Sequence, residues 1–382
     1  MIAQRLKKDL NYYEAIAALV GTIIGAGVLG IPFVIAKVGF LIGALFMVVM
    51  AVLVVVLHLM LGEVVTATRE PLQLVGLTRR YLGKGAGWIM GLAYVLSLNG
   101  VLLAYLVGVG DVFAAFVPGT AFMWSVIFFV LGSFVVVSGV AFAKHVSFVM
   151  TAVKVLVLLG IIILSVRGVA AEHVQTISWE NIFLPFGVIL FALSGISALP
   201  LVEIIDHKKR EFKRVIVVGT LIAAVLYFFF ALAVVAVTGS ATTEVATIGL
   251  GQALGPLVLV FGNVFAFFAM GSSFILIGLA LTGVYSFDYN VPRVPAALLA
   301  CAVPFVLFVA GARQFVTILG LVGSLFIALE MFLIVLAFLR MRRTAPSASS
   351  RYIQHPRLWG YTLLTVFAIA GALGVWEWLS NI

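Results

Sequence analysis

The sequence has little charge and almost no cysteine, and both shortages limit what the chain can be. Only 10% of its 382 residues are charged while 64% are hydrophobic, a balance outside the range of water-soluble globular domains. The single cysteine, Cys301, permits no intrachain disulfide and no cysteine metal site, and the five scattered histidines include no pair spaced by four residues. With no Ser/His/Asp or His/Glu grouping of a catalytic kind either, we expect neither an enzyme nor a bound metal or cofactor.

Long apolar runs occupy most of the chain. A run of about 18 or more apolar residues is typical of a transmembrane helix, and we place eleven such spans at about 12–36, 40–66, 87–117, 121–142, 146–167, 181–205, 213–239, 252–285, 294–311, 314–340 and 357–380. The basic start, MIAQRLKKDLNYYEA, leads into a long span and not into a short apolar region with a cleavage site, so we expect no removable signal peptide. The sequence predicts an all-α polytopic membrane protein.

The basic residues are distributed unevenly between the two sides of the predicted bundle. With the N-terminus in the cytoplasm, 19 of the 23 lysines and arginines fall in cytoplasmic segments; the outer segments hold only Lys37, Arg167 and Arg313, and Lys154 lies inside a span. This bias follows the positive-inside rule and predicts a multi-pass protein of the cell membrane with a cytoplasmic N-terminus and an extracytoplasmic C-terminus. The net charge of +9 therefore reflects orientation in the lipid bilayer and not binding to nucleic acid.

The first span is interrupted by residues that weaken a helix. Its stretch GTIIGAGVLGIP, residues 21–32, holds four glycines and a proline, although glycine inside a helix costs about 1 kcal/mol relative to alanine and proline about 3 kcal/mol. The end of this stretch, GVLGIP (27–32), is matched by GISALP (195–200) in the sixth span. Because the second copy begins five spans after the first, the copies lie in opposite orientations, and we expect helix breaks near residues 24–27 and 193–196. Paired interrupted spans are typical of the binding site of a secondary transporter, whereas isolated glycines more often serve close helix packing.

Three segments resemble known permeases. GTIIGAGVLGIP resembles the first-span signature of the amino acid/auxin permease and the hydroxy- and aromatic amino acid permease families of the amino acid–polyamine–organocation superfamily. FALSGISALPLVEIIDHKKREFKRVIVVGT resembles their sixth span with its basic loop, and SSFILIGLALTGVYSFDY (272–289) resembles their eighth span. The resemblance implies a leucine-transporter-like fold of two inverted five-helix repeats, here 1–170 and 181–341, with an eleventh transmembrane helix in 355–382. It also implies transport of amino acids with a coupling cation.

An interrupted helix can solvate an amino acid zwitterion inside the bilayer. The N-terminal end of a half-helix presents N–H groups and positive dipole to an anion, while unwound carbonyl oxygens accept from cations. We therefore expect the substrate carboxylate at Gly25, Ala26 and Gly27. In the sixth span, carbonyls from Phe191 to Ser194 would accept from the substrate ammonium, and the Phe191 ring would cover the site. Room for the substrate side chain is expected at Ser194, Gly195 and Ser197, and the pathway is expected to be lined by Asn99 and Tyr105.

The eighth and fifth spans supply candidates for the coupling cation. In the resembled fold, adjacent hydroxyls of the eighth span face first-span carbonyls and complete a cation site, which assigns Ser272 and Ser273 with the carbonyls of Gly21 and Ile24. Lys154 is the one ionisable group in SFVMTAVKVLVLLGIIILS, and a charged lysine near the bilayer centre costs about 2.5–3.5 kcal/mol on insertion scales. Its ammonium either snorkels to the headgroups or occupies the place where other members of the fold hold sodium, near Ser273 and the first-span carbonyls. Because burial disfavours the charged form, Lys154 could load and release a proton.

The sequence therefore favours a proton-coupled amino acid symporter that works by alternating access. Sodium-coupled symport, which needs the serine pair without titration of the lysine, and exchange or uniport are the alternatives; a channel or an integral-membrane enzyme is a remote one. Glu330, near mid-depth in the tenth span, is a functional candidate by position alone, and Glu63 and Asp288 are expected to pair with basic residues as gates. The patterns specify neither which amino acid is carried nor the oligomeric state.

Overall fold

The computed structural model describes residues 2–68, 72–174, 177–179, 182–200, 209–344 and 352–380, and within these ranges the chain is helical and has no β-strand. The α-helices in chain order are α1 (Ile2–Ile23), α2 (Gly27–Val38), α3 (Phe40–Ala67), α4 (Leu74–Leu82), α5 (Lys84–Ala114), α6 (Ala121–Ser138), α7 (Val140–Ser165), α8 (Leu184–Leu193), α10 (Lys209–Thr238), α11 (Ala246–Leu254), α12 (Pro256–Gly283), α13 (Arg293–Val309), α14 (Phe315–Leu321), α15 (Ala328–Thr344) and α16 (Pro356–Ser380). Short 3-10 turns are η1 (Val166–Gly168), η2 (Ala171–Val174) and η3 (Gly239–Ala241), and π-helical turns are η4 (Val284–Asp288) and η5 (Val322–Ile327).

Several of these helices, some of them joined end to end, are long and apolar enough to cross a membrane. In the described part of the chain, seven helical segments qualify on length and composition: Phe40–Ala67, Lys84–Ala114, Ala121–Ser138, Glu211–Ala241, Pro256–Ser286, Phe315–Thr344 and Pro356–Gly374. The bent pair Ala15–Ile23 and Gly27–Val38 forms an eighth. The remaining predicted spans correspond to α7, to α8 with the residues that follow it, and to α13. The prediction of an all-α polytopic membrane protein is confirmed.

Two predicted span boundaries were wrong, and a glycine explains each. The predicted fourth and fifth spans are separated at Gly139, a few residues earlier than expected. The predicted eighth span, 252–285, begins inside the short α11, which lies mostly in the predicted loop and is separated at Gly255 from the long α12. Both glycines have a positive φ, 105° and 97°, which side chains with a Cβ rarely adopt. Pro256 then occupies the first position of α12, where its missing N–H costs nothing.

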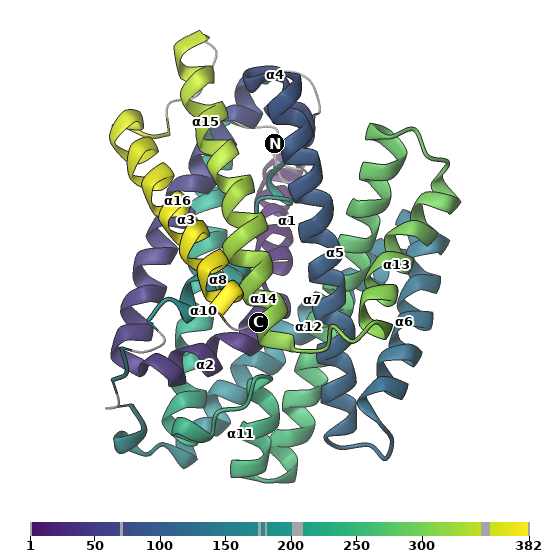
Figure 1. Ribbon diagram of the computed structural model, residues 1–382, viewed down its shortest axis with the longest axis vertical. Coiled ribbons are helices and arrows are strands. Elements are labelled where there is room, and N and C mark those ends of the chain that lie inside the picture. Colours follow the sequence, from purple (N-terminus) through teal and green to yellow (C-terminus); the bar gives the residue numbers. More distant parts are fainter. Residues whose placement is uncertain are drawn as a thin grey trace.

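Two half-helices from opposite ends of the molecule meet in its middle (Figure 1). α1 comes from the end at which the N-terminus and α4 lie, and α8 comes from the direction of α11. Around them, α10 packs against α1 and α3, while α12 packs against α5 and α7. The opposite directions of α1 and α8 agree with an inverted arrangement; the exact bounds of the two repeats stay a prediction.

The outer surface of the bundle carries large apolar side chains. Leu41 and Leu45 on α3, Phe134 on α6, and Leu156 and Ile163 on α7 are between 64% and 70% exposed. Apolar surface of this extent on a single chain marks a region that is covered by another phase or partner. On helices of membrane-spanning length, we expect that phase to be the lipid hydrocarbon.

A buried ion pair ties α3 to the end of α15. The Glu63 carboxylate lies 2.7 Å from the guanidinium of Arg342, and it also accepts the backbone N–H groups of Tyr352 and Ile353 at 2.6 and 3.0 Å. The expectation that Glu63 pairs with a basic residue is confirmed, although a role as a gate stays a prediction. The side chain of Asp288, the other predicted gate, lies outside the described residues.

Candidate functional site

Both predicted helix breaks are present. α1 ends at Ile23 and α2 begins at Gly27, with an angle of 51° between the two halves. α8 ends at Leu193, the next two residues are not helical, and a turn follows at 196–198. The N–H groups of the first turn of α2 and the last carbonyls of α1 and α8 therefore face the interior without helical partners of their own.

The break glycines permit close helix contact. None of the glycines in the two breaks has a positive φ, so backbone geometry does not require them. A Cβ added at Gly27 would stand 2.5 Å from the Cα of Ala192 on α8, and one at Gly195 would stand 2.8 Å from Cγ1 of Ile23 on α1. Close packing against the α8 backbone therefore requires a glycine at position 27, while the contact of its backbone N–H with a substrate carboxylate stays a prediction.

Tyr227 on α10 connects the two breaks. Its hydroxyl donates to the carbonyl oxygen of Ile23 at 2.6 Å and lies 3.4 Å from that of Ala192. The side chain is fully buried. One phenol thus satisfies carbonyls at the ends of both half-helices, a role that the sequence analysis missed because a tyrosine within an apolar span carries no specific pattern.

His58 on α3 supports the second break. Its Nε2 lies 3.2 Å from the backbone N of Gly195, and its Nδ1 lies 2.9 Å from the Thr220 hydroxyl on α10. Since the backbone N–H can only donate, Nε2 accepts from Gly195, and Nδ1–H then donates to Thr220. The ring is fully buried. The spacing of the histidines along the chain gives no sign of this contact, and it was not predicted.

The Lys154 ammonium is surrounded by neutral oxygen acceptors. From α7, Nζ donates to the carbonyl oxygens of Gly21 and Ile24 at 2.7 Å each and to the Ser272 hydroxyl of α12 at 3.2 Å. The three N–H donors of an ammonium match these three acceptors. The side chain is fully buried, which excludes snorkelling to the surface. The structure therefore brings together four of the five predicted cation-coupling residues.

The fifth of these residues, Ser273, which we expected beside the ammonium, is not among the hydrogen-bond partners of Lys154. A Cβ added at Gly25 would be 3.0 Å from the Tyr105 hydroxyl and 3.1 Å from the Ser273 hydroxyl. Gly25 therefore allows the first break to approach α5 and α12 closely. Ser272 meets the ammonium, and Ser273 faces the backbone next to the pocket described below.

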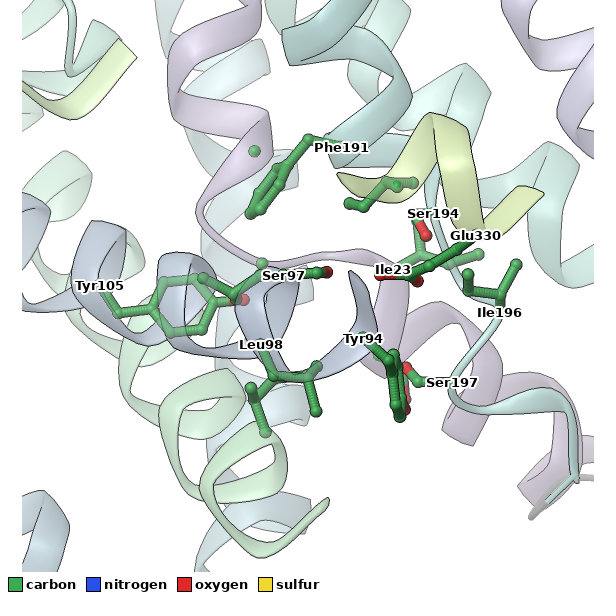
Figure 2. Close-up of a pocket in the computed structure, with 16 residues that line it drawn as sticks. Ile23, Tyr94, Ser97, Leu98, Tyr105, Phe191, Ser194, Ile196, Ser197 and Glu330 are labelled. Atoms are coloured by element: carbon green, nitrogen blue, oxygen red, sulfur yellow. The ribbon is translucent and has the colours of Figure 1, made fainter. Parts of the chain in front are cut away.

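A pocket opens between the breaks and the helices α5, α12 and α15 (Figure 2). Its empty volume is about 520 Å³, including the part open to the surroundings. Five predicted substrate-binding residues line it: Gly25, Gly27, Phe191, Ser194 and Ser197. Ala26, Gly195 and Asn99 are not among the lining residues, and the Asn99 amide donates to the Val95 carbonyl of its own helix at 2.7 Å. Additional polar lining that the sequence analysis did not select comes from Thr22, Tyr94 and Ser97.

Glu330 reaches this pocket from the first turn of α15. It is 1% exposed, and its Oε1 has no hydrogen-bond partner among the described residues. The Ser97 hydroxyl of α5 is beside the carboxyl. No group of three or more His, Cys, Asp and Glu residues in the described ranges could hold a metal ion.

The fold and the site define a class of protein, a membrane transporter of the leucine-transporter fold. The crystal structure of MhsT in complex with L-phenylalanine matches 94% of this chain and 97% of its own, with a TM-score of 0.72 and 16% identity. Mhp1, a nucleobase-cation-symport-1 family transporter in a closed conformation with bromovinylhydantoin bound, matches 94% of this chain and 86% of its own, with a TM-score of 0.62 and 16% identity. At such identities the likeness shows the fold alone.

The sequence comparison identifies the family. Residues 11–377 match the tryptophan/tyrosine permease family, and the chain belongs to it. A relative, glutamine transporter 2 of Aliivibrio fischeri, is 20% identical over 350 residues, which is 88% of this chain and 90% of the relative. The protein is thus an amino acid transporter and not an enzyme. The expected resemblance to aromatic amino acid permeases is confirmed for the permease family, and membership of the wider superfamily stays a prediction.

Proposed function

We propose that the protein is a proton-coupled symporter that carries aromatic amino acids across the cell membrane by alternating access, with its N-terminus in the cytoplasm. The substrate binds in the pocket between the two helix breaks, and the proton binds to Lys154. The family supports the substrate class, since its name refers to tryptophan and tyrosine. The MhsT structure contains L-phenylalanine, an amino acid of similar size.

The single observation that carries this proposal is the set of contacts made by Lys154. When the amine is protonated, its three N–H groups satisfy the carbonyls of Gly21 and Ile24 and the hydroxyl of Ser272. When the proton leaves, one donor is lost and a lone pair faces oxygen atoms, which weakens the bond between α7 and the end of α1. Protonation thus favours the arrangement in which α1 is held against α7 and α12.

The same carbonyls link the proton to the substrate. Ile23 and Gly25, on either side of Ile24, line the pocket, so a shift of the α1 end on deprotonation changes the surface that the substrate contacts. A ligand and a proton that both prefer one arrangement bind with positive coupling. Downhill movement of protons would then drive accumulation of the amino acid.

Transport by purified protein in proteoliposomes tests the proposal. An inward proton gradient is expected to drive accumulation of labelled tryptophan or tyrosine, a protonophore to abolish it, and replacement of sodium by choline to have little effect. Lys154→Ala is expected to lower proton-driven accumulation at least about ten-fold, which corresponds to 1.4 kcal/mol of lost coupling, while counterflow exchange persists because the helix breaks remain. Lys37→Ala, which removes an exposed lysine of α2, is the matched control and is expected to behave like the wild type.

If sodium and not a proton were the coupling ion, the substitutions around Lys154 would have the opposite order of severity. The Gly21 and Ile24 carbonyls and the serine hydroxyls are oxygen ligands of the kind that hard cations prefer. If sodium were the coupling ion, Ser272→Ala and Ser273→Ala would be more damaging than removal of the lysine. Sodium-dependent uptake that survives Lys154→Ala would overturn the proton assignment.

A further inference from the structure

Glu330 is the carboxyl group that the proposed coupling mechanism does not use. It is almost completely buried, its Oε1 lacks a hydrogen-bond partner among the described residues, and it lines the pocket between the helix breaks. A buried acceptor without a donor is unfavourable in a protein interior, and more so inside a bilayer. A ligand that brings a donor would remove this cost.

Glu330 shares the pocket with polar and apolar side chains. Figure 2 shows its carboxyl directed from α15 toward Ser97 of α5, within the pocket. The same pocket also has apolar walls, to which Leu98, Ile277 and Ile327 contribute from three different elements. The Lys154 ammonium is hydrogen-bonded to the α1 carbonyls and Ser272 instead, so it does not neutralise Glu330 by direct contact.

We propose that Glu330 and Ser97 form a subsite that hydrogen-bonds the N–H or O–H donor at the end of the substrate side chain. This rests on the proposed function, in which the amino acid's charged groups bind at the helix breaks. The ring of an aromatic side chain then lies between the apolar walls, and its indole N–H or phenol O–H donates to the free Oε1 of Glu330. The preferred substrates are aromatic amino acids that carry such a donor, and phenylalanine, which has none, is disfavoured.

The physical reason for the selectivity is the unpaired acceptor. A site built to hydrogen-bond a substrate hydroxyl or N–H rejects the analogue without it, because the buried polar group of the site is then left unsatisfied. Tyrosine and phenylalanine differ by this one hydroxyl. Methylation of the donor, as in O-methyltyrosine and 1-methyltryptophan, removes the hydrogen bond while it keeps the ring.

Equilibrium binding to the purified full-length protein tests the inference, because it needs no ion gradient. For the wild type we expect a Kd for tyrosine at least about ten-fold below that for phenylalanine and for O-methyltyrosine, and the same order for tryptophan against 1-methyltryptophan. In Glu330→Leu the tyrosine-to-phenylalanine ratio should fall to within about two-fold, and in Glu330→Gln, which keeps an acceptor oxygen, it should be intermediate. Glu244→Gln, a carboxyl outside this pocket, is the matched control and should keep the wild-type ratio.

Two results would overturn the inference. One is a wild-type protein that binds tyrosine and phenylalanine equally; this test remains decisive even if the Glu330 variants do not fold. The other is a Glu330→Leu protein in which both affinities change by the same factor. Either result leaves proton-driven uptake and its dependence on Lys154 untouched, so failure of the subsite and failure of the symport mechanism are distinguishable.

Discussion

A methyl group at Gly27 has no free space, so this glycine of the first-span motif is needed for close packing of α2 against α8. The added carbon would meet the Cα of Ala192 at 2.5 Å, and backbone atoms of a packed helix cannot move aside as a side chain end does. Gly25 differs, because its neighbours are two hydroxyls, those of Tyr105 and Ser273. Within one motif, therefore, one glycine lies against a helix backbone and the other lies against polar groups at the pocket.

Gly27→Ala is accordingly expected to act on stability more than on binding. Overpacking of this kind costs about 1–3 kcal/mol, so the melting temperature of the detergent-solubilised protein should fall by several degrees. Gly160→Ala on α7 is the matched control, since a Cβ there meets nothing within 4 Å. A Gly27→Ala protein that melts like the control but binds substrate weakly would show that contact with the substrate, and not close packing, is the main reason for a glycine at this position.

At the scale of the element, the helix break of the sixth span is stabilised by a side chain from the neighbouring helix α3. The backbone N–H of Gly195 has lost its helical acceptor, and His58 of α3 accepts it through Nε2 at 3.2 Å. The other ring nitrogen is fixed by Thr220 of α10. His58 is a positioning residue: it does not line the pocket, and it holds the segment that does.

His58→Leu should therefore weaken substrate binding through the break. Leaving a buried N–H unpaired costs about 1–3 kcal/mol, which corresponds to a rise in Kd of about five-fold or more. His58→Gln should recover much of the loss, because its amide oxygen can accept from the same N–H. Substrate titration of the three proteins is the measurement; an equal effect of leucine and glutamine would mean that the ring acts by its volume alone.

Element positions were predictable where residues act locally. The glycine-rich stretches located both helix breaks, since glycine and proline weaken a helix wherever it packs. The short helix α11 was missed because most of it lies in the loop expected before residue 252, and hydropathy does not register the positive φ of Gly255 that ends it. Lys154 stood out as a charge within a span, and it contacts the expected carbonyls of Gly21 and Ile24, but its hydroxyl partner is Ser272 and not the expected Ser273. Asn99, chosen on the same ground of polarity, bonds its own helix instead.

At the scale of the whole molecule, the charge bias predicts an orientation that labelling can check. After Cys301 is replaced by serine, single cysteines are placed at Gly85, where added atoms meet nothing within 4 Å, and at the exposed Ala312. A membrane-impermeant maleimide should label Ala312→Cys in intact cells, and Gly85→Cys only after permeabilisation, because arginines and lysines keep the loop before α5 in the cytoplasm. The reverse pattern would place the N-terminus outside and contradict the positive-inside assignment.

By itself the sequence determined that the protein belongs in a membrane, the class of fold and the places where helices break. Hydropathy, the distribution of basic residues and glycine content act over a few neighbouring residues, so they can be read along the chain. Only the tertiary structure decided which oxygen atoms surround Lys154, that His58 and Tyr227 hold the breaks, and that Glu330 reaches the same pocket as Gly25. The residues of these contacts are separated by between 35 and 204 positions where a hydrogen bond joins them. Such pairings follow from how helices pack, which no local pattern in the sequence encodes.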